Sequence, residues 1–408
     1  MTKPRQLITA IDVGTTKVAT IIANVKAQDD VEILGIGIAP SHGMHKGIVV
    51  NMEEAKQSIA ASLKEGERIS GVRIDSAYVG VTGRHISSLN NRGVVAIPRD
   101  DRLVRSKDLK RVLSAARTVT VSEGKRVLHA IPRYYALDGQ EGVRQPVGMH
   151  GARLDVETHI ITASISSIQN LAKCVRSIGI DVEDLILEPL ASAEAVLTPE
   201  EREAGVIMAD IGGGTTDIAV FKGGSIYHTS IIPVAGYQVT SDISIGLGLP
   251  FNIAENMKKS YGNVAPSLDV DPAAEVVGIE NGHSASYREL CDVIRARMEE
   301  LLQLIMLEMP TTDYQTLAPF GLVLTGGTSN LAGIDELGRS VLDIPVRRGR
   351  PLNSGVYGIS EILHDPSYAT TLGLILWQVR GKEGAAFGMK SGSIWNDFSS
   401  FIKKLFRA

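Results

Sequence analysis

Two short stretches of the chain contain residue types that suit the binding of a polyphosphate. Asp12 opens the stretch DVGTTK, and Asp210 opens the longer stretch DIGGGTTD. Consecutive backbone N–H groups of a Gly-rich turn form a nest for anions, because glycine places no Cβ between the backbone and the ligand. An Asp at a strand end can bind hydrated Mg²⁺ through water, since this ion keeps several waters and takes few protein ligands. We therefore predict two phosphate loops on facing domains, with Asp12 and Asp210 bound to Mg²⁺ through water and Lys17 as a cation beside the first loop. Their residues are Asp12, Gly14, Thr15, Thr16 and Lys17 in the first, and Asp210, Gly212, Gly213, Gly214, Thr215, Thr216 and Asp217 in the second.

A third Gly-containing motif follows an apolar strand in the sequence LTGGTSNLAGI, residues 324–334. Its turn contains Gly326, Gly327 and Thr328, and bare backbone there would let a purine and its ribose lie against the chain. A triple glycine alone also suits an ordinary tight turn, so the prediction depends on all three motifs together. Neither GxxxxGK[ST] nor a strand-linked GxGxxG occurs, which excludes a P-loop and a Rossmann dinucleotide site.

The two phosphate loops lie in segments that repeat one pattern of strands and turns. Residues 7–39 and 205–236 each predict strand, Gly-rich turn, strand, turn and strand, because runs of Val and Ile are bounded by glycine. Asp12 and Asp210 are 198 residues apart, about half the chain. The coincidence of acid and glycine positions favours a duplicated α/β domain with mixed sheets over two β-meanders that are similar by chance.

Beyond the repeats the two halves differ. In the first half, strand signals surround the stretch SKDLKRVLSAARTV, which predicts a helix with Ser106 as its N-cap. A small α+β module is therefore expected as an insertion, and four glycines in 378–393 predict a flexible linker. We expect first-domain segments 1–83 and 163–197 around an insertion at 84–162, second-domain segments 198–233 and 304–377 around an outer part at 234–303, a linker at 378–393 and a terminal helix at 394–408.

Composition limits the classes of protein that the chain can represent. Its 408 residues carry 42 Lys and Arg against 46 Asp and Glu, a formal charge of -4 that argues against nucleic-acid binding. The two cysteines, Cys174 and Cys291, support neither a disulfide framework nor a zinc cluster. Because no signal peptide and no apolar run of about 18 residues occurs, we expect a cytosolic protein or one that contacts a membrane from one side.

The last 15 residues, IWNDFSSFIKKLFRA, form an amphipathic pattern. Apolar residues recur at helical spacing, and three basic residues stand against one acid. We predict a peripheral membrane anchor for an anionic surface, since insertion of the apolar face supplies most of the affinity; docking onto a partner helix is the alternative. Its residues are Ile394, Trp395, Phe398, Phe401, Ile402, Leu405 and Phe406 on the apolar face, with Lys403, Lys404 and Arg407 beside them.

Together these motifs resemble the actin superfamily, which includes chaperone ATPases, sugar kinases and actins. Within it the chain looks like the FtsA family of bacterial cell-division proteins, on the phosphate loops, the LTGG turn and the stretches 127–154 and 234–248. Actins carry their first-half insertion after the opening meander, where this chain has only the loop 41–51. Here the insertion follows SAYVGVTG, as in FtsA and in PilM of pilus assembly. A PilM-like adaptor and an actin-fold kinase or ATPase remain the alternatives.

The resemblance implies duplicated actin-like, ribonuclease-H-like domains that bind ATP and Mg²⁺ in the cleft between them. In relatives an acid and a base flank the adenosine, and Glu255 and Lys258 in NIAENMKK match them, although a solvated ion pair is the alternative. Glu188 in LEPLASAEAVL resembles the residue that positions water in chaperone ATPases; alternatively it is an acid favoured at a helix N-terminus. We expect a nucleotide-dependent scaffold with weak ATPase activity at most.

The resemblance also implies partners and a location. FtsA proteins polymerise on the inner face of the cytoplasmic membrane, bind the C-terminal tail of FtsZ and recruit later division proteins. The insertion, 84–162, would contact the next subunit, and the outer part, 234–303, would bind the FtsZ tail. Arg297, Glu300 and Leu301 share one predicted helix face there. His283 stands near where some relatives have Arg.

Overall fold

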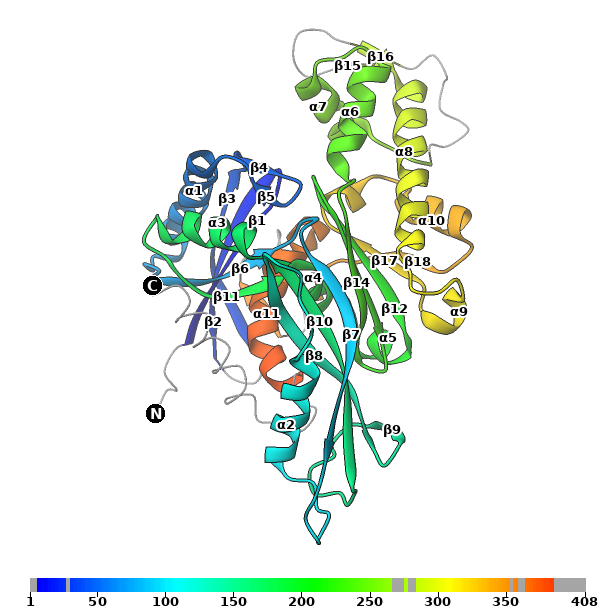
Figure 1. Ribbon diagram of the computed structural model, residues 1–408. Coiled ribbons are helices and arrows are strands. Elements are labelled where there is room, and N and C mark those ends of the chain that lie inside the picture. The colour runs from blue at the N-terminus through cyan, green and yellow to red at the C-terminus, as the bar shows by residue number, and fades with distance from the viewer. Residues whose placement is uncertain are drawn as a thin grey trace.

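Two mixed β-sheets form the body of the protein, as the computed structural model in Figure 1 shows. The structure describes residues 6–26, 30–265, 275–277, 284–352, 355–358 and 364–384. The first sheet has the strand order β11-β6-β1-β2-β3-β19, and the second has the order β14-β13-β12-β17-β18. First-sheet strands are β1 Gln6–Val13, β2 Lys17–Val25, β3 Val31–Pro40, β6 Ser76–Val81, β11 Asp181–Leu187 and β19 Val356–Gly358. Second-sheet strands are β12 Val206–Ile211, β13 Thr216–Lys222, β14 Ser225–Ile232, β17 Leu322–Thr325 and β18 Val346–Arg348.

The predicted duplication is confirmed by the pairing of these strands. In each sheet a meander of three antiparallel strands is extended by a parallel neighbour on its first strand. The loops between the first two strands of each meander are the predicted phosphate loops. Asp12 pairs with Ala19 and Asp210 pairs with Asp217, so both acids lie next to the loop that closes each hairpin.

Helices cover both sheets and fill the space between them. We call each sheet with the helices that pack on it a lobe. The first lobe contains the first sheet together with α1 (Met52–Ser70) and α3 (Ile165–Arg176). α11 (Ala369–Gly384) packs on the first sheet, α4 (Glu188–Val196) packs on the second, and the two helices pack on each other. The second sheet buries Val206 and Met208 toward this helix pair and Ile207 and Ala209 toward a separate core. That second core contains residues of α6 Gly236–Gly246, α7 Phe251–Tyr261, α8 Tyr287–Leu307 and α10 Ile334–Leu342. Shorter elements are β4 Met44–His45, β5 Ile48–Val49, α5 Pro199–Ala204, β15 Glu275–Val277, β16 Ser284–Ser286, α9 Tyr314–Leu317, η1 Gly327–Asn330 and η3 Pro366–Tyr368.

The predicted insertion is a four-stranded sheet of order β7-β10-β8-β9 covered by one helix. It has a core of its own, and it packs against the edge strand β14 of the second sheet. Ser88 Oγ donates a hydrogen bond of 2.8 Å to the carbonyl of Thr229, whose hydroxyl lies 3.0 Å from His159 Nε2. The elements are β7 Ser87–Ala96, α2 Ser106–Arg117, β8 Lys125–Leu137, β9 Gln140–Val143 and β10 Arg153–Ser164.

The predicted N-cap at Ser106 is wrong. Arg105 is the N-cap of α2, and its backbone N–H donates to Asp108 Oδ2 at 2.9 Å. Asp108 at N3 therefore accepts from the N-cap N–H, as the N3 acid of a capping box does, and Ser106 is the first helical residue.

The end of the chain departs from the predicted domain boundaries. Residues 304–377 were expected to form one segment of the second domain, but β19 pairs with β3 and α11 lies in the core of the first lobe. The linker predicted from residue 378 is also wrong at its start, because α11 runs to Gly384. Gln378 is buried and Val379 packs on the core, so tertiary contacts override the helix-breaking glycines. None of the helices in the described ranges is long and apolar enough to cross a membrane.

Close packing of α11 on α4 depends on Gly373. A Cβ at this position would lie 1.9 Å from the carbonyl oxygen of Ala191. We expect Gly373→Ala to lower the free energy of unfolding by about 1–3 kcal/mol, because the two helices must separate. Gly246→Ala is the matched control, since its Cβ would meet Val293 at an ordinary 3.5 Å. Urea denaturation that gives equal stability for both variants would contradict this packing.

Candidate nucleotide site between the lobes

The two predicted phosphate loops lie against each other. A Cβ on Gly213 would lie 2.3 Å from Thr16 Cγ2, and a Cβ on Gly214 would lie 2.4 Å from Thr15 Oγ1. Glycine is required at both positions because a side chain would force the loops apart. Residues 197 and 199 positions apart in the chain are thus brought into one place between the lobes. A group held by one loop would also touch the other.

Four carboxylates are buried beside these loops. Asp12 extends from β1, Asp210 from β12, Asp217 from β13, and Glu188 begins α4. Each residue is less than a tenth exposed. The structure therefore places Glu188, which we predicted as a water-positioning group, with the predicted strand-end acids. Its position at a helix N-terminus is also observed, so the two interpretations are not exclusive.

Burial and mutual repulsion raise the pKa values of this cluster. Burial raises the pKa of Asp12 to about 6, although Lys17 and a hydrogen bond from Thr371 oppose the shift. Burial likewise raises the pKa of Asp217 to about 7. The pKa of Glu188 lies well above its ordinary value because of burial and of the nearby charges of Asp12, Asp217 and Asp210. Burial also raises the pKa of Asp210.

Hydroxyl groups that the sequence analysis did not identify hold these carboxylates in place. Thr371 donates to Asp12 at 2.9 Å, and its neighbour Thr370 donates to Asp210 at 2.8 Å. Ser192 on α4 donates to the same carboxylate of Asp210 at 2.5 Å. Two consecutive residues of α11 thus bind the acids of both sheets. The Ser/Thr-rich stretch SYATT, residues 367–371, at the start of a helix was the available signal.

A further contact joins the lobes directly. Thr82, which follows β6 in the first lobe, donates a hydrogen bond to Asp217 in the second. Asp217 also accepts from Thr215 at 3.1 Å. Both oxygens of Asp217 are therefore engaged, so this residue orients the second loop and contacts the first lobe.

Lys17 lies beside the acids, as predicted, but it also contacts the start of α11. Its Nζ donates to Ser367 Oγ at 3.0 Å and lies 3.4 Å from the ring centroid of Tyr368. Burial lowers the pKa of Lys17, while Asp12, Asp365 and Asp210 oppose the shift. The ammonium is thus held at the phosphate loops by an aromatic face and a hydroxyl.

The third motif packs against the second phosphate loop. Gly326 has a positive φ of 84°, and a Cβ there would lie 2.2 Å from Asp210 Oδ1. Thr328 donates to the carbonyl of Gly212 at 2.8 Å. Gly327 is not crowded, since a Cβ there would meet Ser367 Cβ at an ordinary van der Waals distance of 3.6 Å. The structure therefore brings the LTGG turn and the second loop together, as predicted.

Glu255 and Lys258 lie on one face of α7 and form an ion pair of 2.7 Å. Lys258 is buried, and its Nζ donates to the carbonyl of Gly236 at 3.0 Å and to Thr240 Oγ1 at 2.7 Å. Gly236 is close to the third motif, because its Cβ would lie 2.5 Å from Thr328 Oγ1. The solvated ion pair considered as an alternative is thus excluded: the pair is half-buried beside the second loop and the LTGG turn.

The acids do not form a set of direct metal ligands. No group of three or more His, Cys, Asp or Glu in the described part of the chain is arranged to bind a metal ion. Four clustered acids nevertheless suit a hydrated dication, because its charge would lower the cost of ionising them. Asp12 and Asp210 therefore fit Mg²⁺ bound through water.

Two of the three residues predicted to contact a partner, Arg297 and Glu300, lie on an accessible face of α8. Arg297 of α8 pairs with Glu300 on the same helix, and its Nη2 donates to Asp242 Oδ1 at 3.1 Å. Leu301 is fully buried in the second core, so its assignment as a partner contact is wrong. Helical spacing correctly placed the three residues on one face of α8. The packing of α8 on α6 decides which side of that face is buried, and spacing does not show it. His283 and the predicted anchor, 394–408, lie outside the described residues.

Solved structures with a similar fold define the class of the protein. The PilM-PilN type IV pilus biogenesis complex matches with a TM-score of 0.67 and 18% identity, over 92% of this chain and 99% of that chain. MreB5 of Spiroplasma citri bound to ADP matches with a TM-score of 0.55 and 14% identity, over 93% and 98%. The chain therefore has an α/β actin-like fold.

Sequence relatives give the family. A cell-division protein FtsA of Pseudomonas aeruginosa is 42% identical over 96% of this chain and 94% of the relative, and that of Escherichia coli is 37% identical over 93% and 91%. The family "Cell division protein FtsA" matches residues 207–373, and "SHS2 domain inserted in FTSA" matches residues 83–162. The chain belongs to the FtsA family of cell-division proteins.

The raised pKa values predict that the ligand-free protein loses stability as pH rises from about 4 to about 7. In this window the folded protein retains protons on Asp12 and Asp217 that the unfolded chain has released, so the free energy of unfolding falls. The share of Asp217 is on the order of 3–4 kcal/mol. Asp217→Asn should remove that share, as measured by urea denaturation at several pH values.

A positive control for this measurement is Asp184 on β11. Burial raises its pKa to about 7 as well, and none of the causes involves an acid of the cluster. Asp184→Asn should flatten the pH dependence by a similar amount. If Asp184→Asn flattens it and Asp217→Asn does not, the cluster is ionised in the folded protein and our account of it is wrong.

Proposed function

We propose that this protein binds ATP with Mg²⁺ between its lobes and, in that state, forms filaments that tether FtsZ to the inner face of the cytoplasmic membrane at the division site. The observation that carries the proposal is the direct contact of two Asp-Gly-Thr loops from duplicated sheets, in a chain of the FtsA family. Recruitment of later division proteins follows the same family assignment.

Binding of ATP is supported by three features of the site. The loops offer backbone N–H groups and the hydroxyls of Thr15 and Thr16 to phosphate oxygens, and Lys17 adds a cation. Glu255, Lys258 and the turn of Gly326, Gly327 and Thr328 lie beside the second loop, where an adenosine would continue from the phosphates. MreB5 of Spiroplasma citri has been solved with ADP and with AMPPNP in the same fold.

Mg²⁺ would be held through water by Asp12 and Asp210, and it would neutralise charge on the phosphates. Glu188 lies close enough to these acids for their negative charges to raise its pKa. Without a ligand, burial and the neighbouring acids raise the pKa of Glu188 well above its ordinary value, so it would act as a base only after bound Mg²⁺ has offset that repulsion. We infer that hydrolysis is slow and that nucleotide acts mainly as a ligand that sets the lobe arrangement.

Filament formation and FtsZ binding rest on the family assignment. Heterologous contacts that do not close into a ring give open filaments, and the insertion 84–162 extends away from the body, where it could meet a second subunit. Arg297 and Glu300 would contact the FtsZ tail on α8, which lies away from the insertion. The tail at 394–408 would hold the protein at the membrane. The PilM likeness concerns the fold alone.

Gly213→Val is expected to lower ATP affinity by at least about tenfold, because the new side chain meets Thr16 and displaces the loops from the phosphates. Isothermal titration with Mg²⁺-ATP measures the effect. Gly246→Val, on an exposed helix end, is the matched control and should bind as the wild type does. Unchanged ATP affinity in Gly213→Val would remove this loop from the site.

Arg297→Glu is expected to weaken binding of an FtsZ C-terminal tail peptide by about tenfold or more, since it reverses a positive charge that a tail carboxylate would meet at this place. Arg297→Gln should act in the same direction without adding a third acid beside Asp242 and Glu300. Arg295→Glu on the same helix, paired with Glu299, is the control for charge reversal. Fluorescence anisotropy showing full affinity in both Arg297 variants would exclude this residue.

A further inference from the structure

Positive charge is concentrated in the insertion. Residues 84–162 carry 14 Lys and Arg against eight Asp and Glu, a net charge of +6. The whole chain has a net charge of -4, so the remaining residues carry -10. A segment of about one fifth of the chain thus has the opposite sign from the rest, and such separation generates a field that orients a protein near a charged surface.

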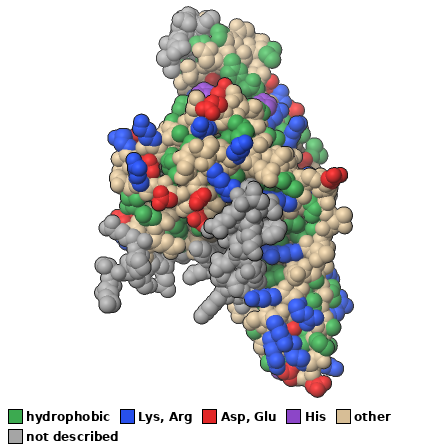
Figure 2. All heavy atoms as spheres, turned by 60° about the vertical axis from the view of Figure 1, so that its left-hand side comes forward, with side chains coloured by type: hydrophobic (Ala, Val, Ile, Leu, Met, Phe, Trp, Pro, Cys, Tyr) green, Lys and Arg blue, Asp and Glu red, His purple; other side chains and the backbone are tan. Residues whose placement is uncertain are grey.

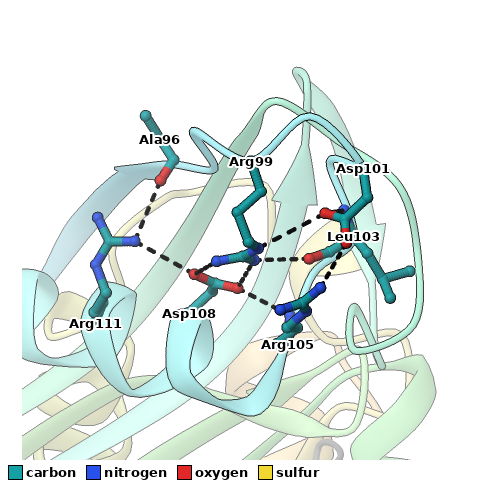
Figure 3. A network of polar contacts seen from close by, with 7 residues as sticks. All are labelled: Ala96, Arg99, Asp101, Leu103, Arg105, Asp108 and Arg111. Atoms are coloured by element: carbon teal, nitrogen blue, oxygen red, sulfur yellow. Dashed lines mark hydrogen bonds and ion pairs between the residues drawn. The ribbon is translucent and has the colours of Figure 1, made fainter.

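The two buried acids of the insertion, Asp108 and Asp155, are neutralised by its own arginines. Figure 3 shows Asp108 of α2 between Arg99 and Arg111. Arg111 donates to Asp108 at 3.3 Å, and Arg99 forms a closer ion pair. Burial alone would raise the pKa of Asp108, but these contacts lower it below its usual value. Asp155 is likewise buried between Arg92 and Arg153, each at 2.8 Å.

The outer face of α2 consists of exposed cations. Lys107, Lys110, Arg111 and Arg117 share this face with Ser114, and all five are exposed. The opposite face is buried and contains Asp108, the only acid of the helix. Within the described ranges, Lys107, Lys110 and Arg117 form no ion pair. Like charges three or four residues apart destabilise a helix, so this face is unfavourable for α2 itself.

The insertion that carries this face contacts α11, the last described helix, at its base. His129 at the base of the insertion contacts Trp377 of α11, with ring centroids 6.3 Å apart. In Figure 1 the insertion is at the lower end, whereas α6, α7 and α8 form the upper end. Figure 2 shows Lys and Arg side chains gathered over that lower end. The tail itself carries Lys403, Lys404 and Arg407.

We propose that the outer face of α2 is a second membrane contact, which binds anionic lipid headgroups beside the C-terminal anchor. The inference rests on the proposed function, in which the tail enters the membrane. A single weak anchor binds reversibly and a polybasic surface is a common second signal. An open row of lysines and arginines suits a lipid surface better than a defined acidic peptide, because it offers charge without a binding pocket. The rest of the chain, with its net charge of -10, would be repelled by an anionic membrane. This repulsion would turn α8 away from the membrane.

The test uses the full chain and vesicles of phosphatidylcholine with about one third phosphatidylglycerol, measured by co-sedimentation at low and high salt. Lys107→Glu/Lys110→Glu should lower the partition coefficient by at least about tenfold on these vesicles, and the difference should shrink at high salt. Arg288→Glu/Arg295→Glu reverses two exposed charges on α8 and is the matched control, which should bind as the wild type does. Equal circular dichroism and unfolding midpoints establish that all variants are folded.

Trp395→Glu separates this proposal from the proposed anchor. If Trp395→Glu loses vesicle binding and the α2 variant binds normally, the α2 contact is refuted, the anchor stands, and the basic face then serves an acidic protein. If the α2 variant loses binding and Trp395→Glu keeps it, the α2 contact is supported and the anchor fails. If the wild type does not bind anionic vesicles, both are refuted.

Discussion

Four buried carboxylates at the junction of the two lobes are the constraint on which the rest of the structure depends. Asp12, Asp210, Asp217 and Glu188 come from separate elements, yet burial and their mutual repulsion raise their pKa values together. The empty protein must either keep protons on them or bear the cost of buried charge. A ligand that brings a dication removes that cost. The junction is therefore arranged for a charged ligand at the expense of stability without one.

Helix α11 transmits this constraint through the molecule. Thr370 and Thr371 bond to carboxylates of different sheets, so rotation of one lobe relative to the other must strain or break one of the two bonds. The helix cannot easily absorb the change, because Gly373 fixes it against α4. Its last described turns contact the insertion through Trp377 and lead toward the C-terminal tail. One element thus connects the phosphate loops with the segment predicted to bind the membrane.

Local motifs made the sheets and loops predictable, and long-range packing limited the rest. An Asp, a glycine turn and a threonine follow each other in the chain, so both hairpins could be read from sequence. Thr82 and Ser192 come from distant segments, and nothing in their surroundings marks them as partners of these acids. Thr371 lies in the Ser/Thr-rich stretch 367–371, which indicates hydroxyl groups but not the acid that they contact. The prediction that Leu301 contacts a partner was wrong, because helical spacing defines a face without showing which side of it the neighbouring helix covers. The return of β19 and α11 to the first lobe is a matter of topology, which sequence order does not encode.

The two electrostatic features of the protein act in different media and therefore independently. The carboxylates lie in the interior, where the low local dielectric makes them sensitive to protons and to a bound cation. The cations of α2 lie in solvent, where charges separated by more than about 8–10 Å are screened at physiological salt. Added salt should consequently weaken the contact of α2 with a charged surface while leaving the buried carboxylates largely unchanged. A change of pH between about 5 and 7 should alter the protonation of the carboxylates but not the charge of α2, because lysines and arginines stay protonated in this range. A protein that must respond to nucleotide while it remains at a surface benefits from this separation, since neither response disturbs the other.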